Sequence, residues 1–498
     1  MDTAVTPVVE IAQGKLSGLV KDGVQRFNGI PFAKARRWQM PEAADPWSGV
    51  RDATRFGAIA PQVKSASEGV LGGTPGEQHE DCLFLNVWTP GCDGGKRPVM
   101  VWIHGGAFVT GAGSVGTYNG KYLAARGDVV VVTINYRLGV FGFLNLRDAS
   151  GGKAPGTGSE GIADQIEALR WVKENIATFG GDPNNVTIFG ESAGGMSVGA
   201  LLASPKARGL FHKAIPQSGA ADIGMTRERS AKLAEMVLEK LGVDAETALT
   251  LPGKTVLDAQ AALLATPNAT GALPFGPTVD GDILPKRGIQ MVREGNAAGV
   301  PVLTGTTRDE WKLFSLGMNP LTDERLGRYM AQRVGEENRE RFLSVYSEGE
   351  LMDRWNAFMT DQTFMAPATR LLDAQAPHAP TYLYRFDWPS PAMGGKLGAC
   401  HAIEIGFVFG TYNEKAAGQF FGTGPVADAI SIAMMDAWIE FARRGAPGCD
   451  ATGAWQRYDS KSRKTMIFGE SAPHMTGAPN EARRAAWESV PEERIGAA

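Results

Sequence analysis

Ser192 lies in the segment Gly190-Glu-Ser-Ala-Gly194, which follows an apolar run and precedes small residues typical of a helix. A serine between a strand and a helix occupies a very tight turn, and glycines two positions before and after it leave the space that this turn needs. The turn exposes the hydroxyl at the carboxyl end of the strand and directs backbone N–H groups of the new helix towards it. The segment therefore predicts a nucleophilic serine.

The same pattern occurs a second time, at Gly195-Met-Ser197-Val-Gly199. Ser197 falls more than one turn inside the expected helix, and no strand precedes it. Because the pattern has chemical meaning only between a strand and a helix, we interpret Ser197 as a packed helix serine.

A serine hydroxyl is a weak nucleophile, so it needs a base within hydrogen-bond reach and a third group that orients the base. The chain offers six histidines. In an open α/β sheet the functional residues follow the strands, and in this architecture the histidine comes last in chain order. His401 fits best, because it lies in a loop after the expected strand Thr381–Asp387. His474, in the tail after the last strand, is the alternative.

The acid should come between the serine and the histidine in chain order. The expected strand Pro301–Thr306 runs into a loop that carries Asp309 and Glu310. Spacing does not choose between these adjacent carboxylates. Asp280 and Asp282 are more distant options and are more simply interpreted as turn residues.

The segment His104-Gly-Gly-Ala-Phe108 follows a strongly apolar strand and can place bare backbone N–H groups near the serine. Together with the N–H that follows Ser192, it gives three candidate donors for an oxyanion hole. They belong to Gly106, Ala107 and Ala193. A glycine-rich loop alone would be unremarkable, but its coincidence with the serine turn and the His401 loop favours the catalytic interpretation.

The elements that must position these residues follow one another as strand, helix and strand. Val129–Ile134 is an apolar run expected of a covered parallel strand, and apolar residues three and four apart from Ile162 to Phe179 predict a helix before the strand at Val186. This order predicts right-handed crossovers in a mostly parallel sheet flanked by helices, an α/β fold. Further strands are expected at Val8–Val20, Val24–Ile30, Leu83–Trp88, Val99–Ile103, Lys213–Pro216, Pro301–Thr306, Thr381–Asp387 and Thr465–Phe468, and a further helix at Pro425–Arg444.

Two long segments, about 225–300 and 320–375, have helix-like sequence without strands and without a sharp linker. We therefore predict one domain over residues 1–498, in which these insertions form a helical cap over the site. The tail beyond Asn480 is charged and contains alanines, and we expect it to be frayed.

Composition narrows the possible partners. The formal net charge of −4 gives no sign of a basic surface, so no nucleic-acid partner is expected. The four cysteines contain no C-x-x-C pair, so we expect neither a metal site nor a disulfide scaffold, and no cofactor. No apolar run reaches about 18 residues and the amino terminus lacks a secretory pattern, which predicts a cytoplasmic protein without a membrane segment.

Seven segments taken together resemble the type-B carboxylesterases, most closely their bacterial para-nitrobenzyl esterase branch. The resemblance covers almost the whole chain and implies an α/β-hydrolase fold with a Ser-Glu-His triad. It thereby selects Glu310 over Asp309, and the matching triad is Ser192, Glu310 and His401. The segments are Glu80-Asp-Cys-Leu-Phe-Leu-Asn86, His104-Gly-Gly-Ala-Phe108, Asn135-Tyr-Arg137, Gly190-Glu-Ser-Ala-Gly-Gly195, Gln217-Ser-Gly219, Thr307-Arg-Asp-Glu310 and His401-Ala-Ile-Glu-Ile-Gly-Phe-Val-Phe409.

The reaction that the resemblance implies is hydrolysis of small to medium, largely apolar carboxylic esters through an acyl-enzyme. The same triad could cleave amide, carbamate or lactone bonds. A non-catalytic binding protein of the same fold is disfavoured, because all three triad positions are filled. The expected partner is a small-molecule ester, and the protein is expected to be a monomer or a small homo-oligomer. Five apolar residues near site-forming loops are candidates for the substrate pocket, although core packing would explain each equally well: Phe108, Trp311, Phe314, Phe364 and Phe407.

Two departures from the family pattern are informative. Family members that work outside the cell commonly pair the cysteine of the Glu-Asp-Cys motif with an upstream cysteine, and Cys82 has none. This agrees with a cytoplasmic location. Pro61 to Glu80 also contains no aromatic residue that could hold a quaternary ammonium, so a choline ester is not expected as substrate.

Overall fold

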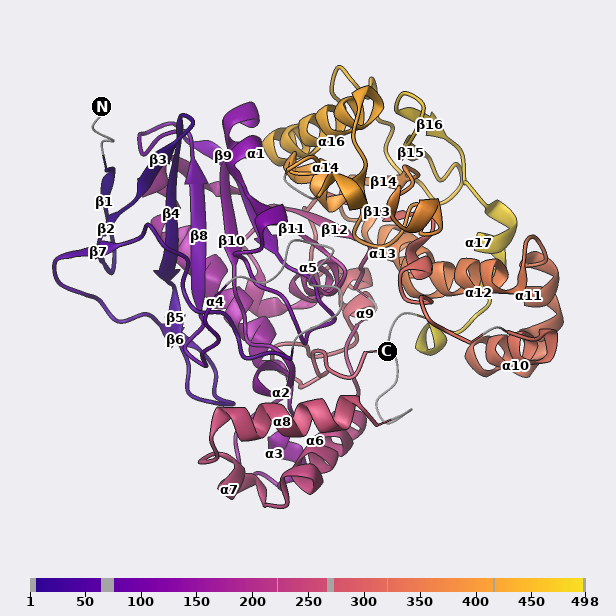
Figure 1. The fold of residues 1–498 in the computed structure, drawn as a ribbon, viewed down its shortest axis with the longest axis horizontal. Helices are drawn as coiled ribbons and strands as arrows, with labels where there is room; N and C mark the ends of the chain where they lie inside the picture. Colours follow the sequence, from indigo (N-terminus) through magenta and orange to yellow (C-terminus); the bar gives the residue numbers. More distant parts are fainter. Residues whose placement is uncertain are drawn as a thin grey trace.

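The computed structural model describes residues 6–63, 76–221, 223–266, 273–319, 321–414 and 417–495. Its main feature is a large twisted sheet (Figure 1). The strands of this sheet are β3 (Leu19–Lys21), β4 (Val24–Pro31), β8 (Phe84–Thr89), β9 (Arg97–Ile103), β10 (Val130–Ile134), β11 (Gly181–Glu191), β12 (Lys213–Gln217), β13 (Val302–Thr307), β14 (Thr381–Phe386), β15 (Thr465–Phe468) and β16 (His474–Thr476).

The order of the strands is β16-β15-β14-β13-β12-β11-β9-β10-β8-β4-β3. From β15 to β10 in this order the neighbours run parallel, and the pairs at both ends are antiparallel. The predicted mostly parallel sheet is therefore confirmed. Since the carboxyl ends of parallel strands meet at one edge, the residues after β9, β11 and β13 are brought close together.

Helices cover both faces of the sheet, and strand β9 shows why. Val99, Val101 and Ile103 belong to one buried cluster, and Met100 and Trp102 belong to another. Successive side chains of a strand point to opposite faces, so a strand that is apolar throughout supplies two cores. The first cluster includes α4 (Glu160–Asn175), and the second includes α16 (Pro425–Arg444).

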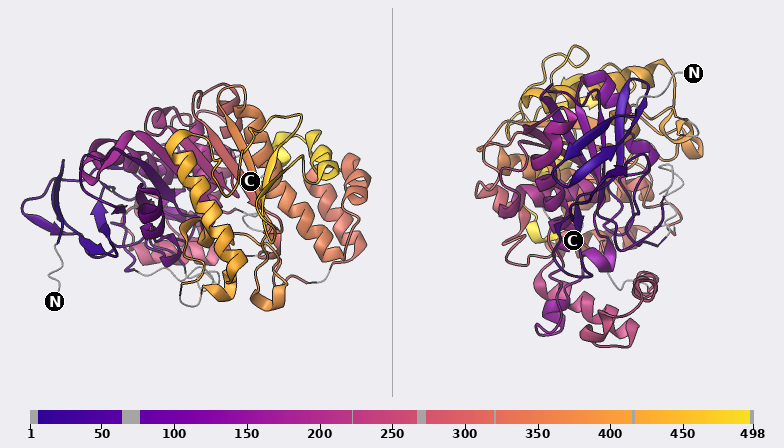
Figure 2. Two further views of the ribbon diagram at one scale, coloured as in Figure 1. Left: turned by 90° about the horizontal axis from the view of Figure 1, so that it is seen from above. Right: turned by 90° about the vertical axis from the view of Figure 1, so that its left-hand side faces the viewer.

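The two predicted helical insertions consist of helices and connecting loops in their described residues. The first contains α6 (Arg227–Leu241), α7 (Ala245–Ala248), α8 (Gly253–Leu264) and α9 (Gly288–Arg293), and α6 to α8 project away from the sheet in Figures 1 and 2. The second contains α10 (Asp323–Val334), α11 (Arg339–Val345), α12 (Leu351–Thr360), the single π-helical turn η7 (Asp361–Met365) and α13 (Ala366–Gln375). Residues 267–272 of the first insertion lie outside the described part of the chain. So do residues 64–75, which belong to the segment Pro61 to Glu80 that contains no aromatic residue for binding a quaternary ammonium.

The remaining elements are short. They are β1 (Val8–Ile11), β2 (Gly14–Ser17), β5 (Ala33–Lys34), β6 (Glu42–Ala43), β7 (Val50–Asp52), η2 (Gly116–Tyr118), α1 (Lys121–Gly127), α2 (Gly139–Gly142), α3 (Leu146–Ala149), η3 (Ile176–Phe179), α5 (Ala193–Ala203), η4 (Pro205–Ala207), η5 (Glu310–Lys312), η6 (Glu336–Asn338), η8 (Ala392–Gly395), α14 (Ile405–Phe409), α15 (Gly418–Phe421), α17 (Glu481–Glu488) and η9 (Glu492–Arg494).

Two predictions about the ends of the chain are wrong. The expected strand Val8–Val20 is three strands, because the chain reverses at Ala12-Gln13 and β1 pairs with β2 in a small separate sheet with β7. The tail beyond Asn480 is also not frayed where it is described, since residues 481–495 include α17 and η9. Trp487 of α17 is 2% exposed and packs edge to face on Phe342, with ring centroids 4.7 Å apart.

Candidate active site

Ser192 lies at the turn between β11 and α5, with φ 57° and ψ −125°. This conformation is strained for a residue with a side chain and places the serine at the carboxyl edge of the sheet. The turn depends on close approach of backbones: a Cβ on Gly194 would lie 2.0 Å from the carbonyl oxygen of Ile103, and one on Gly190 would lie 2.5 Å from the same atom. The two glycines therefore allow β11 and α5 to approach the end of β9.

Ser197, the second match to the serine pattern, is a packed helix serine as predicted. It is completely buried inside α5, and its Oγ accepts a hydrogen bond from Gln165 Nε2 at 3.0 Å.

The imidazole of His401 lies against Glu310. Nδ1 is 2.6 Å from Glu310 Oε2, and both side chains are buried. Glu310 begins η5 directly after β13, and His401 precedes α14. The adjacent Asp309 points elsewhere, because its Oδ2 accepts the N–H of Ala399 at 3.0 Å and it pairs with Arg308. The geometry thus distinguishes the two carboxylates that spacing could not separate.

Two further donors hold the other oxygen of Glu310. Glu310 Oε1 accepts the hydroxyl of Ser218 at 2.7 Å and the backbone N–H of Thr307 at 2.8 Å. Both oxygens of the carboxylate are therefore occupied, which fixes the orientation of the group that orients the histidine. The segment Gln217-Ser-Gly219 was noted in the sequence, but nothing in it indicated this role for Ser218.

The second imidazole nitrogen of His401, Nε2, lies next to Glu191 in the serine turn. His401 Nε2 is 3.1 Å from Glu191 Oε1, and Glu191 is the residue immediately before Ser192. Among the described residues, no hydrogen bond joins this nitrogen to Ser192 Oγ. The ring therefore lies between the carboxylate of Glu310 and the residues of the serine turn.

Three buried glutamates surround this histidine, and only Glu310 was predicted. Burial, with a contribution from Glu310, raises the pKa of Glu191 well above its usual range. Burial, with Glu191 and Glu310, also raises the pKa of Glu404 to about 8. Glu404 Oε1 accepts a hydrogen bond from Gln217 Nε2 at 3.2 Å. Both Glu191 and Glu404 lie inside segments that resemble family motifs. The sequence does not show that their carboxyl groups are buried, because the burial depends on the packing of distant elements.

The candidate oxyanion segment turns sharply after β9. Gly106, Ala107 and Phe108 all have positive φ, at 115°, 54° and 60°. The carbonyl oxygen of Gly106 accepts the N–H groups of Val109 and Thr110, each at 3.0 Å. This loop lies beside the serine turn, because a Cβ on Gly105 would be 3.1 Å from the Cβ of Ser192. The predicted donors Gly106 and Ala107 thus lie near Ala193, the first residue of α5.

His104, at the start of this segment, has a structural environment. Its ring stacks on Tyr136 with centroids 4.5 Å apart, and Tyr136 Oη donates to the carbonyl oxygen of His104 at 2.8 Å. Burial lowers the pKa of His104 to about 4. The side chain is therefore neutral at physiological pH and anchors the loop.

Of the five pocket candidates, three gather around His401. The ring centroids of Phe364 and Phe314 lie 4.9 and 5.0 Å from the imidazole, and Trp311 lies 4.9 Å from Phe314. Phe314 is 45% exposed, so this aromatic cluster is open to solvent on one side.

The other two candidates are core residues. Phe108 is fully buried with an edge-to-face contact to Phe143. Phe407 is fully buried and packs against Phe386 and Tyr412 in the cluster under α16. The structure therefore gives no support to a pocket role for Phe407, because α14 turns this side chain towards the sheet.

Comparison with known proteins decides the family. A model described as the carboxylesterase family matches residues 5–487. The chain belongs to the carboxylesterase family. This carboxylesterase is 39% identical over 473 residues to the para-nitrobenzyl esterase of Bacillus subtilis (strain 168), covering 93% of the chain and 94% of that relative. It is 33% identical over 487 residues to the phenmedipham hydrolase of Pseudarthrobacter oxydans, covering 93% and 95%.

Solved structures agree with this assignment. The carboxylesterase of Geobacillus stearothermophilus superimposes with a TM-score of 0.87 at 41% identity, over 97% of this chain and all of the other. A structure titled PNB esterase gives 0.88 at 37% identity, over 97% and 99%. The fold of this carboxylesterase is thus the α/β-hydrolase fold, and the enzyme hydrolyses carboxylic esters. Within the described residues, no helix is long and apolar enough to cross a membrane.

Proposed function

We propose that this carboxylesterase uses Ser192, Glu310 and His401 as its catalytic triad. The observation that carries the proposal is the position of the imidazole. Its Nδ1 is 2.6 Å from the buried Glu310 carboxylate, and its Nε2 reaches the residue that precedes Ser192. Catalytic hydrogen bonds to a serine are often long or poorly aligned without substrate and tighten when substrate binds, so the lack of a direct hydrogen bond to Ser192 among the described residues is compatible with this role.

In the proposed mechanism, His401 takes the proton of Ser192 Oγ as the oxygen attacks the ester carbonyl. Glu310 stabilises the imidazolium, and His401 then gives the proton to the leaving alcohol. Water repeats the sequence on the acyl-enzyme and releases the carboxylic acid. The N–H groups of Gly106, Ala107 and Ala193 are proposed to hold the oxyanion, since backbone donors already fixed by the turn need no reorganisation during the reaction.

The proposed substrates are small to medium esters with a largely apolar group. Support comes from the aromatic cluster of Trp311, Phe314 and Phe364, which offers apolar ring faces directly beside His401. The relative named para-nitrobenzyl esterase suggests esters of aromatic alcohols as the first to test. The helical insertions are proposed to form a cap within one domain over residues 1–498. Support comes from the second insertion, where η7 supplies Phe364 to this cluster and Thr360 at the end of α12 accepts the backbone N–H of Trp311.

Replacing Ser192 by alanine tests the triad. Without the nucleophile, we expect kcat for a short-chain p-nitrophenyl ester to fall by about 10⁴-fold or more. Ser197→Ala is the matched control, because it removes the hydroxyl of the second pattern match on the same helix and should retain activity within about threefold per folded molecule. The proposal is wrong if Ser192→Ala hydrolyses the ester at the parent rate.

A further inference from the structure

The carboxyl-terminal helix α17 packs against the helices that form one wall of the active site. It lies beside α11 and α12 in Figures 1 and 2, although more than a hundred residues separate it from them in the chain. Trp487 is the apolar anchor, with ring centroids 4.7 Å from Phe342 and 5.2 Å from Phe358. Burial of one tryptophan ring against two phenylalanine rings explains why this short segment is helical and ordered.

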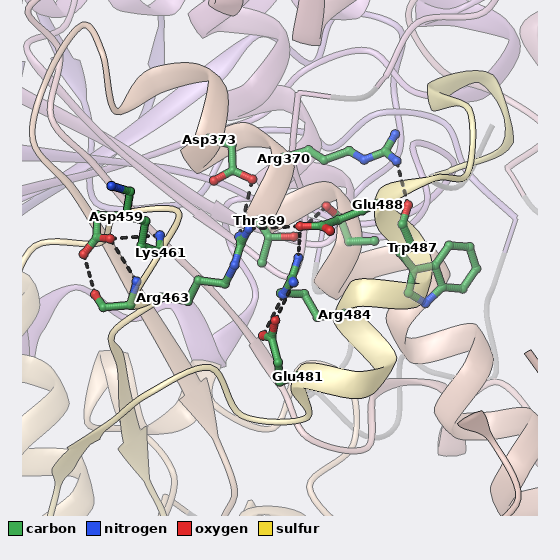
Figure 3. Close-up of polar contacts among 12 residues, drawn as sticks. Thr369, Arg370, Asp373, Asp459, Lys461, Arg463, Glu481, Arg484, Trp487 and Glu488 are labelled. Carbon is green, nitrogen blue, oxygen red and sulfur yellow. Dashed lines mark hydrogen bonds and ion pairs between the residues drawn. The ribbon is translucent and has the colours of Figure 1, made fainter. Parts of the chain in front are cut away.

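Polar contacts fasten the outer side of α17. Arg370 of α13 donates to the carbonyl oxygen of Trp487 at 2.9 Å (Figure 3). It also donates to the carbonyl oxygen of Val490 at 2.7 Å. Arg484 pairs with Glu481 and Glu488 on its own helix, and Arg463 reaches Glu488 at 3.3 Å and Asp373 at 3.5 Å. These contacts border an open cavity of about 680 Å³, so they are partly hydrated and individually weak.

The inner side of α17 reaches a different and better buried partner. Arg483 donates to both oxygens of Asp361, from Nε at 2.7 Å and from Nη2 at 3.1 Å, and Asp361 is 3% exposed. Tyr346 Oη also donates to Asp361 Oδ2, at 2.6 Å, and accepts the indole N–H of Trp487 at 2.7 Å. A bidentate arginine on a buried carboxylate fixes both distance and orientation.

Asp361 is the first residue of the π-helical turn η7, which shapes the wall of the site. Phe364 of this turn has its ring 4.9 Å from the imidazole of His401. Thr360, directly before the turn, accepts the backbone N–H of Trp311, the residue after Glu310, at 3.1 Å. A single π-helical turn is an uncommon conformation that is held by its surroundings and is frequent at functional sites.

We propose that Arg483 and Trp487 are positioning residues for ester hydrolysis, acting through Asp361 on the turn that places Phe364 against His401. The carboxyl-terminal helix then sets the width of the acyl or alcohol pocket without touching substrate. This inference rests on the proposed function, because it assumes that His401 is the catalytic base. It predicts that removing the contact between Arg483 and Asp361 changes the selectivity between substrates. Removing the ion pairs of Arg484 with Glu481 and Glu488 should not change it.

The experiment compares Arg483→Gln with Arg484→Gln, the same change at neighbouring positions of one helix. The substrates are p-nitrophenyl acetate and p-nitrophenyl benzoate, which share a leaving group and differ in acyl size. We expect Arg483→Gln to change the ratio of their kcat/KM values by about three- to tenfold, with a change in KM. Arg484→Gln should keep that ratio, since the ion-pair partners of Arg484, Glu481 and Glu488, belong to α17 itself. Loss of folded enzyme alone would scale kcat for both esters equally and leave KM and the ratio unchanged.

Two measurements keep the inference testable if Arg483→Gln folds poorly. Trp487→Phe keeps an aromatic ring but removes the indole N–H donor to Tyr346 and part of the buried ring, and it should shift the ratio in the same direction by a smaller factor. Hydrogen exchange of residues 360–366 should accelerate in Arg483→Gln and not in Arg484→Gln. The inference is overturned if folded variants keep the parent ratio, or if both arginine variants change it equally. Failure of the proposed triad would appear separately, as an active Ser192→Ala enzyme, while the exchange measurement would still test the link from α17 to η7.

Discussion

The carboxyl group of Glu191 contacts the imidazole nitrogen of His401 that is not bound to Glu310. It lies 3.1 Å from Nε2, and burial with the neighbouring Glu310 raises its pKa well above the usual range. When Glu191 is protonated it is neutral, and when it is ionised it places a negative charge beside the nitrogen that becomes positive during catalysis. The contribution of this residue to the rate should therefore depend on pH.

Glu191→Gln tests this dependence. Where the parent carboxyl is protonated it is neutral like the amide, so the two enzymes should have similar kcat/KM at the lowest pH tested. Once the pH is high enough to ionise the parent carboxyl, only the parent acquires the charge, and the variant should become slower by about tenfold, the value of one hydrogen bond to a charged group. The measurement is the pH profile of kcat/KM for both enzymes, with the exposed Glu239→Gln as control. A parent-to-variant ratio that stays constant from pH 6 to 9 would exclude this role.

At the scale of single residues, the sequence predicts those site residues whose positions depend on chain order and on the type of turn. Ser192 and His401 follow from the strand-turn-helix context and from their places after strands. Glu310 could not be separated from Asp309 by spacing, since which of two adjacent carboxylates points inward depends on the turn after β13. Ser218 and Glu404 could not be predicted, because each contacts a residue that is distant in the chain. Ser218 bonds Glu310, which lies 92 residues later, and Glu404 bonds Gln217, which lies 187 residues earlier.

At the level of elements, the approach of α5 to the end of β9 sets the position of the nucleophile. A Cβ on Gly194 would lie 2.0 Å from the carbonyl oxygen of Ile103, a backbone atom that cannot move aside without displacing the strand. Gly194→Ala must therefore shift α5, and with it Ser192 and the N–H of Ala193. We expect kcat to fall by about 100-fold or more, since small misplacements of reacting groups have effects of this size.

The matched control is Gly209→Ala. Gly209 has a positive φ, which Gly194 lacks, but a Cβ on Gly209 would meet nothing within 4 Å, so the variant should lose only about 1 kcal/mol of stability and keep its kcat. Kinetics of the folded fractions of both variants, checked by circular dichroism, would separate the two cases. Parent-like kcat in folded Gly194→Ala would show that the spacing between α5 and β9 is not critical.

The elements that the sequence predicted well are those whose patterns are local. The apolar runs of β9 and β10 need no partner to be recognised, because a strand covered on both faces is apolar at nearly every position. The helix α17 was missed for the opposite reason. Its charged, alanine-containing sequence buries only Ala486 and Trp487, and its order depends on Asp361, Phe342 and Arg370 far along the chain.

At the scale of the whole molecule, the two cores that cover the sheet also exclude water from the carboxyl groups near its edge. Glu191 and Glu404 are both less than 4% exposed, and burial raises the pKa of each. Burial of a carboxyl group favours its neutral form, and each buried neighbour of the same charge adds to the effect. The folded enzyme therefore holds protons near neutral pH that the unfolded chain would release.

This retention makes the stability of the enzyme depend on pH, and Glu404 provides the measurable case. Its pKa is raised to about 8 in the folded protein, whereas an unfolded glutamate titrates near 4.3. Its stabilising contribution is complete below about pH 4.3 and is lost as pH rises towards 8, by up to about 1.4 kcal/mol per pH unit.

The amide of Glu404→Gln does not titrate. The unfolding free energy of the variant, relative to the parent, should therefore increase between pH 5.5 and 7.5 in urea titrations, while Glu239→Gln, exposed on α6, should follow the parent. Parallel pH curves for the parent and Glu404→Gln would show that Glu404 is already ionised in the folded enzyme.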